Sequence, residues 1–260
     1  MLKRKTMNVK ALICFLFCFS AMVSFAQDGK DAWESTRIPE LVLAFTKTEG
    51  WRHKSIEKGV KTLRELGREN GFIVLQTETA ADFNPENLKN YKLVVFLNTT
   101  GNVLNTQEQA AFKNYIAGGG AFLGIHAATD TEFDWPWYNK LVGAYFNGHP
   151  NDPNVRKATL TVTDATHPAT AHLPKSWERT DEWYNFKSID PNIKVLVTLD
   201  EGSYEGGTNG NYHPIAWYHE NLGGRAFYTG GGHTIESYDE PLFRTHLLKA
   251  MLWCFKRDSE

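Results

Sequence analysis

The sequence predicts an α/β protein built on a mainly parallel central sheet that helices cover on both faces. Short apolar runs of strand length recur along the first half of the chain, and segments with the helical spacing of apolar residues separate them. Glycines stand where these helices should stop. Strands that alternate with helices pair in parallel, because each helix returns the chain to the same edge of the sheet.

The first half of the chain accounts for four strands and two helices. A helix over 55–70 joins the first two strands, because apolar side chains recur there at helical spacing and Gly71 ends the segment. A second helix over 106–117 precedes the fourth strand, with Thr106 as its N-cap and Gln109 at the capping-box position. The four expected strands are the apolar runs 40–46, 72–77, 92–98 and 121–125.

The second half of the chain is less regular. It shows no repeat, no low-complexity tract and no linker, so we expect a single domain over 39–257. Its expected elements are short strands, a tight turn between the last two of them, and a closing helix: strands 158–162, 194–199, 215–219 and 225–229, the turn 221–224 and the helix 241–255.

The N-terminal segment is typical of an export signal. Four basic residues accompany an apolar run over 11–25, which is shorter than the roughly 20 residues that a membrane anchor would need. Ser24 and Ala26 are small residues at the positions that a signal peptidase reads. We therefore expect residues 1–26 to be a cleaved signal peptide, 27–38 a flexible lead-in, and the mature protein to be periplasmic or secreted.

The net charge narrows the range of binding partners, and the cysteine content limits how the fold can be stabilised. Removal of the signal peptide takes the formal charge at pH 7 from −2 to −6, because that segment carries four basic residues and no acidic one. A mildly acidic chain without basic runs argues against nucleic acid, and against a membrane surface after signal cleavage. We expect no nucleotide cofactor, and a homo-oligomer is left open. The mature chain would keep one cysteine, Cys254, so packing and not disulfide bonds must stabilise it.

The most informative segment is the glycine-rich stretch 118–130. A predicted strand runs into Gly124, His126 stands at the apex and small residues follow. This is the layout of a nucleophile elbow, in which small neighbours permit a sharp turn that exposes one side chain. An imidazole at the apex can act as a general base, an electrophilic donor or a metal ligand. The alternative is a histidine that only hydrogen-bonds neighbouring loops.

Other polar residues also stand at predicted strand ends or in turns, where ligand sites of parallel sheets form. His149 lies in a turn-forming context, and His233 follows three glycines after a strand. Asp181 and Glu182 are adjacent, and successive residues of an extended segment face opposite ways, so we choose Glu182 as the one that faces the site. The polar segments that directly follow strands are 46–51, 98–102 and 126–130.

These residues suggest a metal site and a set of substrate contacts. His126, His149 and His233 with one carboxylate would suit a divalent metal such as zinc or manganese, although their spacing is no compact metal signature. The residues expected to bind substrate come from the strand-end loops and from the aromatic segment after the carboxylates: Trp51, Arg52, His53, Asp130, Trp183 and Tyr184.

Six motifs in order resemble those of the ThuA-like, or trehalose utilisation, family. They are Gly-Gly-Gly-Ala-Phe-Leu-Gly-Ile-His-Ala-Ala-Thr-Asp at 118–130, Phe-Asn-Gly-His-Pro at 146–150, Thr-His-Pro at 166–168, Asp-Glu-Trp-Tyr at 181–184, His-Pro-Ile-Ala-Trp at 213–217 and Tyr-Thr-Gly-Gly-Gly-His-Thr at 228–234. The resemblance covers residues 39–256 and implies a flavodoxin-like three-layer sandwich related to class I glutamine amidotransferases. His126 fills the elbow cysteine position of those enzymes, which excludes glutamine hydrolysis through a thiolate.

The resemblance also implies a reaction on a sugar. Family members are associated with the utilisation of trehalose and related disaccharides, beside dehydrogenases that make 3-keto glycosides. A ketone makes the neighbouring C–H bond acidic, so the glycosidic oxygen can be eliminated without the two opposed carboxylates of ordinary glycosidases. We expect a lyase or hydrolase that acts on a keto-glycoside or a related disaccharide derivative, with His126 or Glu182 as the catalytic base and a metal or Arg52 stabilising the enolate.

Two alternatives stay open at this point. One is a metal-dependent glycoside hydrolase that acts on unoxidised sugars. The other is a non-catalytic sugar-binding module that uses tryptophan rings as stacking platforms: Trp51, Trp135, Trp137 and Trp183.

Overall fold

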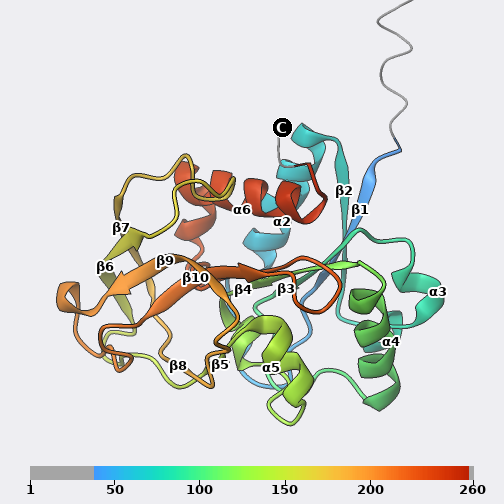
Figure 1. Cartoon of the computed structure of the whole chain (residues 1–260), viewed down its shortest axis with the longest axis horizontal. Coiled ribbons are helices and arrows are strands. Elements are labelled where there is room, and N and C mark those ends of the chain that lie inside the picture. Colours follow the sequence, from blue (N-terminus) through green and yellow to red (C-terminus); the bar gives the residue numbers. More distant parts are fainter. Residues whose placement is uncertain (1–37, 258–260) are drawn as a thin grey trace, which may run out of the picture. The chain divides into compact units, whose positions relative to one another are not determined.

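A nine-stranded sheet forms the centre of the computed structural model, which describes residues 38–257 (Figure 1). The predicted signal peptide and residues 27–37 of the predicted lead-in lie outside the described residues. The strand order across the sheet is β2-β1-β3-β4-β11-β10-β9-β6-β7. The bounds are β1 Glu40–Phe45, β2 Phe72–Thr77, β3 Leu93–Leu97, β4 Ala121–Ile125, β6 Val155–Val162, β7 Ser176–Glu182, β9 Lys194–Asp200, β10 Pro214–His219 and β11 Ala226–Thr229.

Five of these strands, from β2 to β11 in the sheet order, run parallel to one another. β3 and β4 are buried at every residue, as expected of parallel strands covered on both faces. The remaining strands, β10, β9, β6 and β7, extend the sheet by antiparallel pairing. The predicted α/β class with a mainly parallel central sheet is confirmed. The antiparallel half of the sheet comes from the second half of the chain, where the sequence pattern is less regular.

Helices cover the sheet on two sides, which completes three layers. Figure 1 shows α2 (Ile56–Asn70) and α6 (Pro241–Cys254) on one face, and α4 (Thr106–Ala117) and α5 (Pro136–Val142) on the other. The short helix α3 (Pro85–Leu88) packs beside α4. The smaller elements are the two-stranded sheet of β5 (Tyr145–Phe146) and β8 (Phe186–Lys187), and the 3-10 turns η1 (Ala80–Asp82), η2 (His126–Asp130), η3 (Glu201–Ser203) and η4 (Glu236–Asp239).

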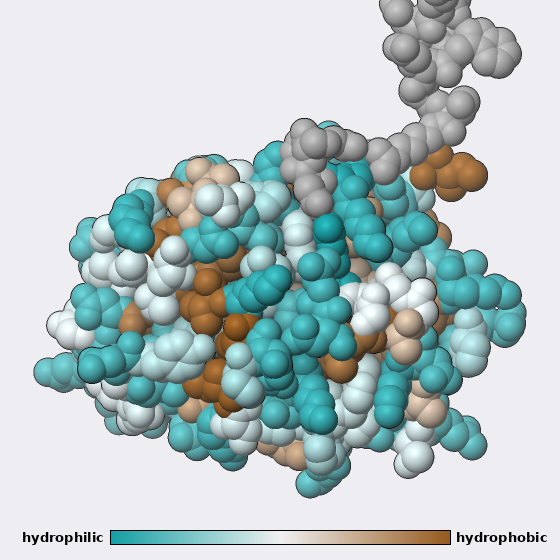
Figure 2. All heavy atoms as spheres, in the orientation of Figure 1, coloured by the Kyte–Doolittle hydropathy of each residue, from teal (hydrophilic) through white to brown (hydrophobic). Residues whose placement is uncertain are grey.

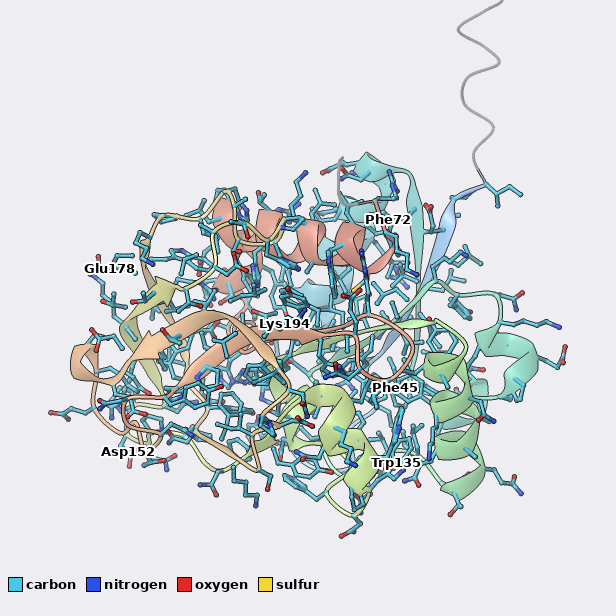
Figure 3. The ribbon with its side chains drawn as sticks, viewed as in Figure 1. Phe45, Phe72, Trp135, Asp152, Glu178 and Lys194 are labelled. Atoms are coloured by element: carbon cyan, nitrogen blue, oxygen red, sulfur yellow. The ribbon has the colours of Figure 1, made fainter. Side chains whose placement is uncertain are left out.

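Aromatic side chains fill the layer between the parallel strands and α4. Phe45, at the end of β1, packs against Phe83 and Phe96 at ring-centroid distances of 4.6 and 5.2 Å (Figure 3). Phe96 in turn stacks on Phe112 of α4 at 5.4 Å. All four rings are at most 1% exposed. Such packing holds the carboxyl ends of β1 and β3 in place, and loops that carry the site start there.

The antiparallel half of the sheet curls back toward the parallel half. β4 and β7 are five strand positions apart in the sheet order. In a flat sheet this would place them about 24 Å apart, since neighbouring strands lie about 4.8 Å from each other. Yet Glu182, the last residue of β7, approaches to 3.2 Å from His126, the first residue after β4. Twist and curvature of the sheet therefore bring two distant strand ends to a single point.

The local predictions are correct except at a few positions. The N-cap of α4 is Asn105 and not Thr106, and the capping box is closed by Glu108 and not Gln109. The carboxylate of Glu108 accepts from the backbone of Asn105, and the Asn105 side chain accepts from the amides of Gln107 and Glu108. Five of the described helices and strands were not predicted from the sequence, namely α3, α5, β5, β7 and β8.

The face of the described region that Figure 2 shows is largely polar. Hydrophilic side chains cover most of the face shown in Figure 2. Within residues 38–257 we find no helix with both the length and the apolar character needed to cross a membrane.

The corrected N-cap leads to a stability prediction. We expect Asn105→Ala to lower the free energy of unfolding by about 1 kcal/mol, because two amides of the first turn lose their acceptor. Thr106→Ala is the matched control and should change it by less than about 0.5 kcal/mol. Urea denaturation of both variants measures the difference, and a larger loss for the Thr106 variant would contradict the assignment.

Candidate functional site

A cavity of about 610 Å³ opens at the carboxyl edge of the parallel strands. Its walls come from the loop after β1, the turn η2, the segment 146–154, the end of β7 and the loop after β11. Its volume lies within the range of about 300–1,000 Å³ that is usual for small-molecule sites. The position agrees with the rule that parallel sheets bind ligands at the carboxyl ends of their strands.

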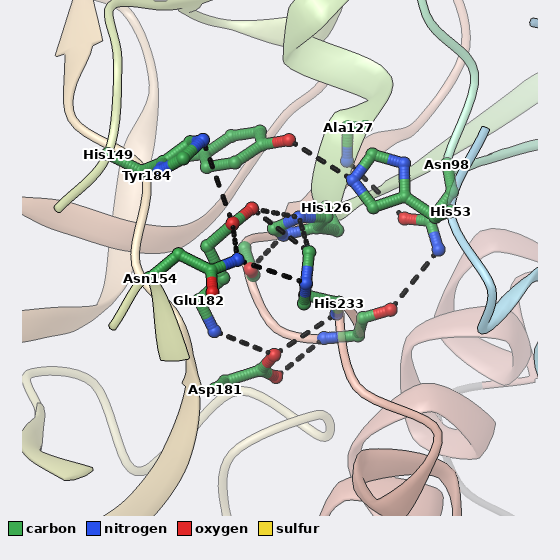
Figure 4. A network of polar contacts seen from close by, with 12 residues as sticks. His53, Asn98, His126, Ala127, His149, Asn154, Asp181, Glu182, Tyr184 and His233 are labelled. Atoms are coloured by element: carbon green, nitrogen blue, oxygen red, sulfur yellow. Dashed lines mark hydrogen bonds and ion pairs between the residues drawn. The ribbon is translucent and has the colours of Figure 1, made fainter. Parts of the chain in front are cut away.

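Four side chains converge at the base of this cavity (Figure 4). They are His53, His126, Glu182 and His233, and one potential ligand atom of each lies within 4.8 Å of those of the others. The Glu182 Oε2 atom is 3.2 Å from Nε2 of His126 and 3.0 Å from Nδ1 of His233. These two nitrogen atoms are 3.3 Å apart. We call this group the histidine–glutamate cluster.

The backbone places His126 in the cluster through a sharp turn. β4 ends at Ile125, and His126 has a φ of 47°, a left-handed conformation that is costly for a side chain of this type. The close packing explains Gly124, where an added Cβ would lie 3.0 Å from the Cβ of Ala128. Nδ1 of His126 donates to the carbonyl oxygen of Gly230 at 3.0 Å, which directs Nε2 at the cluster. The side chain of His126 is fully buried beneath the cavity.

The two adjacent carboxylates at the end of β7 point in different directions. Glu182 is the one that lines the cavity and joins the cluster. Asp181 is fully buried and accepts from the backbone amides of Gly232 and His233 at 2.7 and 3.1 Å, and from the hydroxyl of Ser237 at 2.8 Å. Asp181 therefore positions the loop that carries His233, and Glu182 faces the cavity.

Electrostatics place two members of the cluster, Glu182 and His53, in forms that can bind a cation. Burial disfavours the charged form of Glu182, but its hydrogen bonds with His126 and His233 outweigh this and hold its pKa well below the usual range. Burial, with smaller contributions from His126 and His233, lowers the pKa of His53 to about 2. Near neutral pH the carboxylate is thus ionised and His53 is neutral, which are the protonation states that metal ligation requires.

The donor set fits a divalent cation. Donor atoms about 2.0–2.2 Å from a tetrahedral zinc ion lie about 3.3–3.6 Å from one another. The separations of 3.0–3.3 Å among Glu182, His126 and His233 come close to this.

His149 lies beside the cluster and is not one of its four members. Its Nε2 atom is 3.6 Å from Glu182 Oε1, and its Nδ1 atom donates to the carbonyl oxygen of Pro150 at 2.8 Å. About a quarter of the side chain is exposed (28%), and it lines the cavity. Of the three histidines expected to bind metal, the structure brings His126 and His233 together and adds His53, which we had expected to contact substrate.

The residues expected to bind substrate fall into two groups. Trp51, Asp130 and Tyr184 line the cavity, as does His53. Arg52 lies elsewhere, because its partly exposed guanidinium is paired with Glu57 and Glu78.

Trp183 also lies away from the cavity. It is fully buried, and its Nε1 donates to the carbonyl oxygen of Arg156. It follows Glu182 directly and faces the other side of the chain, which the alternation of an extended segment explains.

Two asparagines support the site, and the sequence analysis did not single out either of them. Asn98, directly after β3 with a φ of 52°, donates to the Ser55 hydroxyl at 3.0 Å and to the Gly232 carbonyl at 3.2 Å. Asn154 donates to Glu182 Oε1 at 2.5 Å. The position of Asn98 at a strand end was a usable signal, since it opens the polar segment 98–102. Asn154 precedes a predicted strand and does not follow one, so the strand-end rule does not select it, and its role depends on the tertiary fold.

Asp130 is a cavity residue outside the cluster whose pKa lies above its ordinary value. Burial raises its pKa to about 6, and interactions with the nearby His149 and Lys187 side chains limit the increase. A carboxyl group with this pKa can hold or release a proton close to neutral pH.

Comparison with known proteins gives one family match and several structural neighbours. The family model described as ThuA, trehalose utilisation, matches residues 41–254. A ThuA-like protein from Bacteroides uniformis is 24% identical with a TM-score of 0.72, over 86% of this chain and 95% of its own. A ThuA-like protein from Parabacteroides merdae is 20% identical with a TM-score of 0.68, over 85% of this chain and 91% of its own. At these identities the two structures establish the fold alone. No curated protein matches the chain.

The raised pKa of Asp130 leads to a prediction about stability and pH. The folded-state pKa of about 6 exceeds the ordinary value of 3.8, so ionising Asp130 destabilises the fold. This loss of stability grows as the pH rises from about 3.8 to about 6, and it is complete at higher pH. We expect Asp130→Asn to raise the free energy of unfolding by on the order of 1–2 kcal/mol at pH 7.5, a figure reduced for the water that reaches the cavity. The gain should shrink at pH 4.5, as measured by urea denaturation.

Asp164→Asn is a control of opposite sign. Hydrogen bonds from the side chain and the backbone of Thr166 lower the pKa of Asp164, so its ionised form stabilises the fold. The Asp164 variant should therefore lose stability at pH 7.5. If both variants changed stability in the same direction, the burial argument for Asp130 would be wrong.

Proposed function

We propose, from the premise that the chain belongs to the ThuA family of trehalose utilisation, that it is an enzyme that cleaves a keto-glycoside. The family supports a carbohydrate-related role, and the cleavage chemistry is our inference from the site. The observation that carries it is the convergence of three imidazoles and a carboxylate under one cavity whose wall holds two further acid–base groups, His149 and Asp130.

The proposed reaction is an elimination next to a ketone. A base removes the proton from the carbon between the ketone and the anomeric carbon. The electron pair of that bond forms a carbon–carbon double bond, the bond to the glycosidic oxygen breaks, and the leaving alcohol takes up a proton. No oxidant or reductant is needed. Later addition of water to the double bond at the anomeric carbon would complete a hydrolysis.

The histidine–glutamate cluster would hold a divalent cation, for which zinc and manganese both suit the ligands. Such a cation supplies positive charge that favours the negative charge developing on a substrate oxygen. The chain prepares the ligands through their outer hydrogen bonds. The Gly230 carbonyl fixes the orientation of His126, and Asn154 fixes one oxygen of Glu182.

We assign the base to His149, and not to His126 or Glu182. His126 is fully buried, and the hydrogen bonds of Glu182 make it a weak base. Since Nδ1 of His149 donates to the Pro150 carbonyl, the lone pair of Nε2 is left free to accept a proton in the cavity. Asp130, with a pKa of about 6, can supply a proton to the leaving oxygen.

The positions of the tryptophans favour an enzyme over a passive sugar-binding module. Of the four tryptophans considered as stacking platforms, Trp51 alone lines the cavity. Trp183 is buried in the core, and Trp135 and Trp137 pack against each other at 4.8 Å on α5 and the residue before it. A module that bound sugars through several rings would bring more of these tryptophans to a shared surface.

The first prediction of this proposal concerns the metal. We expect the purified protein to contain about one equivalent of zinc or manganese and to convert 3-keto-trehalose but not trehalose, with activity lost on chelation and restored by the metal. Glu182→Gln should lower both metal content and turnover, because it removes the charged ligand. His172→Gln, a histidine variant far from the cavity, should change neither.

The results of these assays distinguish the proposed enzyme from the two alternative functions. Chelator-sensitive turnover of unmodified trehalose would favour the metal-dependent glycoside hydrolase. Sugar binding without metal or turnover of either substrate would favour the binding module.

The second prediction concerns the base. We expect His149→Ala to lower kcat on 3-keto-trehalose by roughly 10²–10⁴-fold, because the proton then has no positioned acceptor. Metal content should stay at the wild-type level, since the four cluster residues are intact. Steady-state kinetics and metal analysis on the same preparation test this, and loss of metal together with activity would make His149 a ligand instead.

A further inference from the structure

Trp51 combines exposure with a position on the cavity. Its side chain is 70% exposed, yet the residue lines the cavity whose base is the histidine–glutamate cluster. Single exposed aromatic residues are common on protein surfaces and need no explanation on their own. Tyr212, for example, is 52% exposed and lies outside the cavity lining. Trp51 differs from such residues because neighbouring elements hold the loop that carries it.

The loop 48–53 is held by one residue of a neighbouring strand end. Thr48 forms an isolated parallel bridge with Thr100, and the backbone amide of Glu49 donates to the Thr100 carbonyl at 2.8 Å. The Thr100 hydroxyl accepts from the amide of Gly50 at 3.2 Å and donates to the carbonyl of Trp51 itself at 3.0 Å. The backbone of Trp51 is therefore fixed while its ring is left in water.

The residue after Trp51 adds a second attachment. The guanidinium of Arg52 bonds to Glu57 in α2 at 2.8 Å and to Glu78 after β2 at 2.7 Å. Together with Thr100, these contacts tie the loop to three separate elements. A ring presented on such a loop binds a ligand without a further loss of backbone entropy.

We propose that Trp51 is the stacking platform for a second sugar ring, so that the substrate is a disaccharide derivative and not a monosaccharide. This inference rests on the proposed function and extends it. A pyranose ring has an apolar face that matches an indole, and its hydroxyl groups need polar partners. Lys54 and Asn151 line the same cavity and can provide them. The reacting ring then lies deeper, over the cluster, and the second ring lies against Trp51.

The test compares a disaccharide with a monosaccharide substrate. For Trp51→Ala we expect kcat/KM on 3-keto-trehalose to fall about tenfold, equivalent to about 1.4 kcal/mol, mainly through KM. Turnover of methyl 3-keto-α-glucoside, which has no second ring, should be unchanged. Trp51→Phe should recover part of the loss, and Tyr212→Ala is the control for removal of an exposed aromatic ring. Equal losses of kcat/KM on both substrates, or no loss on either, would overturn the proposal that Trp51 is a stacking platform.

Binding of unoxidised sugars separates this inference from the proposed chemistry. By calorimetry, the wild-type protein should bind trehalose more tightly than methyl α-glucoside, and Trp51→Ala should remove that preference. If the preference depends on Trp51 but no keto-sugar is converted, the platform stands and the proposed reaction is wrong. If keto-sugars are converted but Trp51→Ala alters neither trehalose binding nor KM, the reaction stands and the platform is wrong.

Discussion

The contact between the end of β7 and the parallel half of the sheet is the constraint on which the site depends. Two buried carboxylates make it: Glu182 bonds to His126 and His233, and Asp181 bonds to the backbone of the loop that carries His233. A buried carboxylate is costly unless hydrogen bonds or opposite charge compensate it. Arg179, 3.4 Å from Asp181 and also bonded to Glu240, supplies the compensating charge. The curl of the sheet and the assembly of the cluster are thus parts of the same arrangement.

The fold could be predicted from the sequence where burial was apolar. β3 and β4 are continuous apolar runs, and α2 ends at Gly71 in the left-handed conformation that glycine favours. β7 was missed because its inward positions, Trp177, Arg179 and Asp181, include two charged residues. Buried and exposed residues still alternate along the strand, but hydrophobicity alone does not reveal this because two of the buried residues form an ion pair.

The site could be predicted in part for a related reason. The carboxyl ends of parallel strands lie at one edge, so His126 and His233 were recognised by position alone. His53 was expected near the substrate, and only the turn of the loop after β1 brings it into the cluster. Glu182 reaches His126 through the curl of the antiparallel half, which no local pattern encodes. Arg52 and Trp183 lie outside the cavity lining, and two of their partners, Glu78 and the Arg156 carbonyl, are 26 and 27 residues away in the sequence.

Depth in the cavity divides the chemical roles. His126 and Asn98 adopt left-handed backbone conformations at two neighbouring strand ends, and both are fully buried, so the strain is held by dense packing and hydrogen bonds. Groups fixed in this way can keep a cation and its ligands in place but cannot move with a substrate. His149 and Asp130 are only partly buried and lie on the wall, where protons can be exchanged. The bottom of the cavity is therefore rigid and desolvated, and titratable groups lie above it. This arrangement suits a reaction in which charge develops at one place and protons move at another.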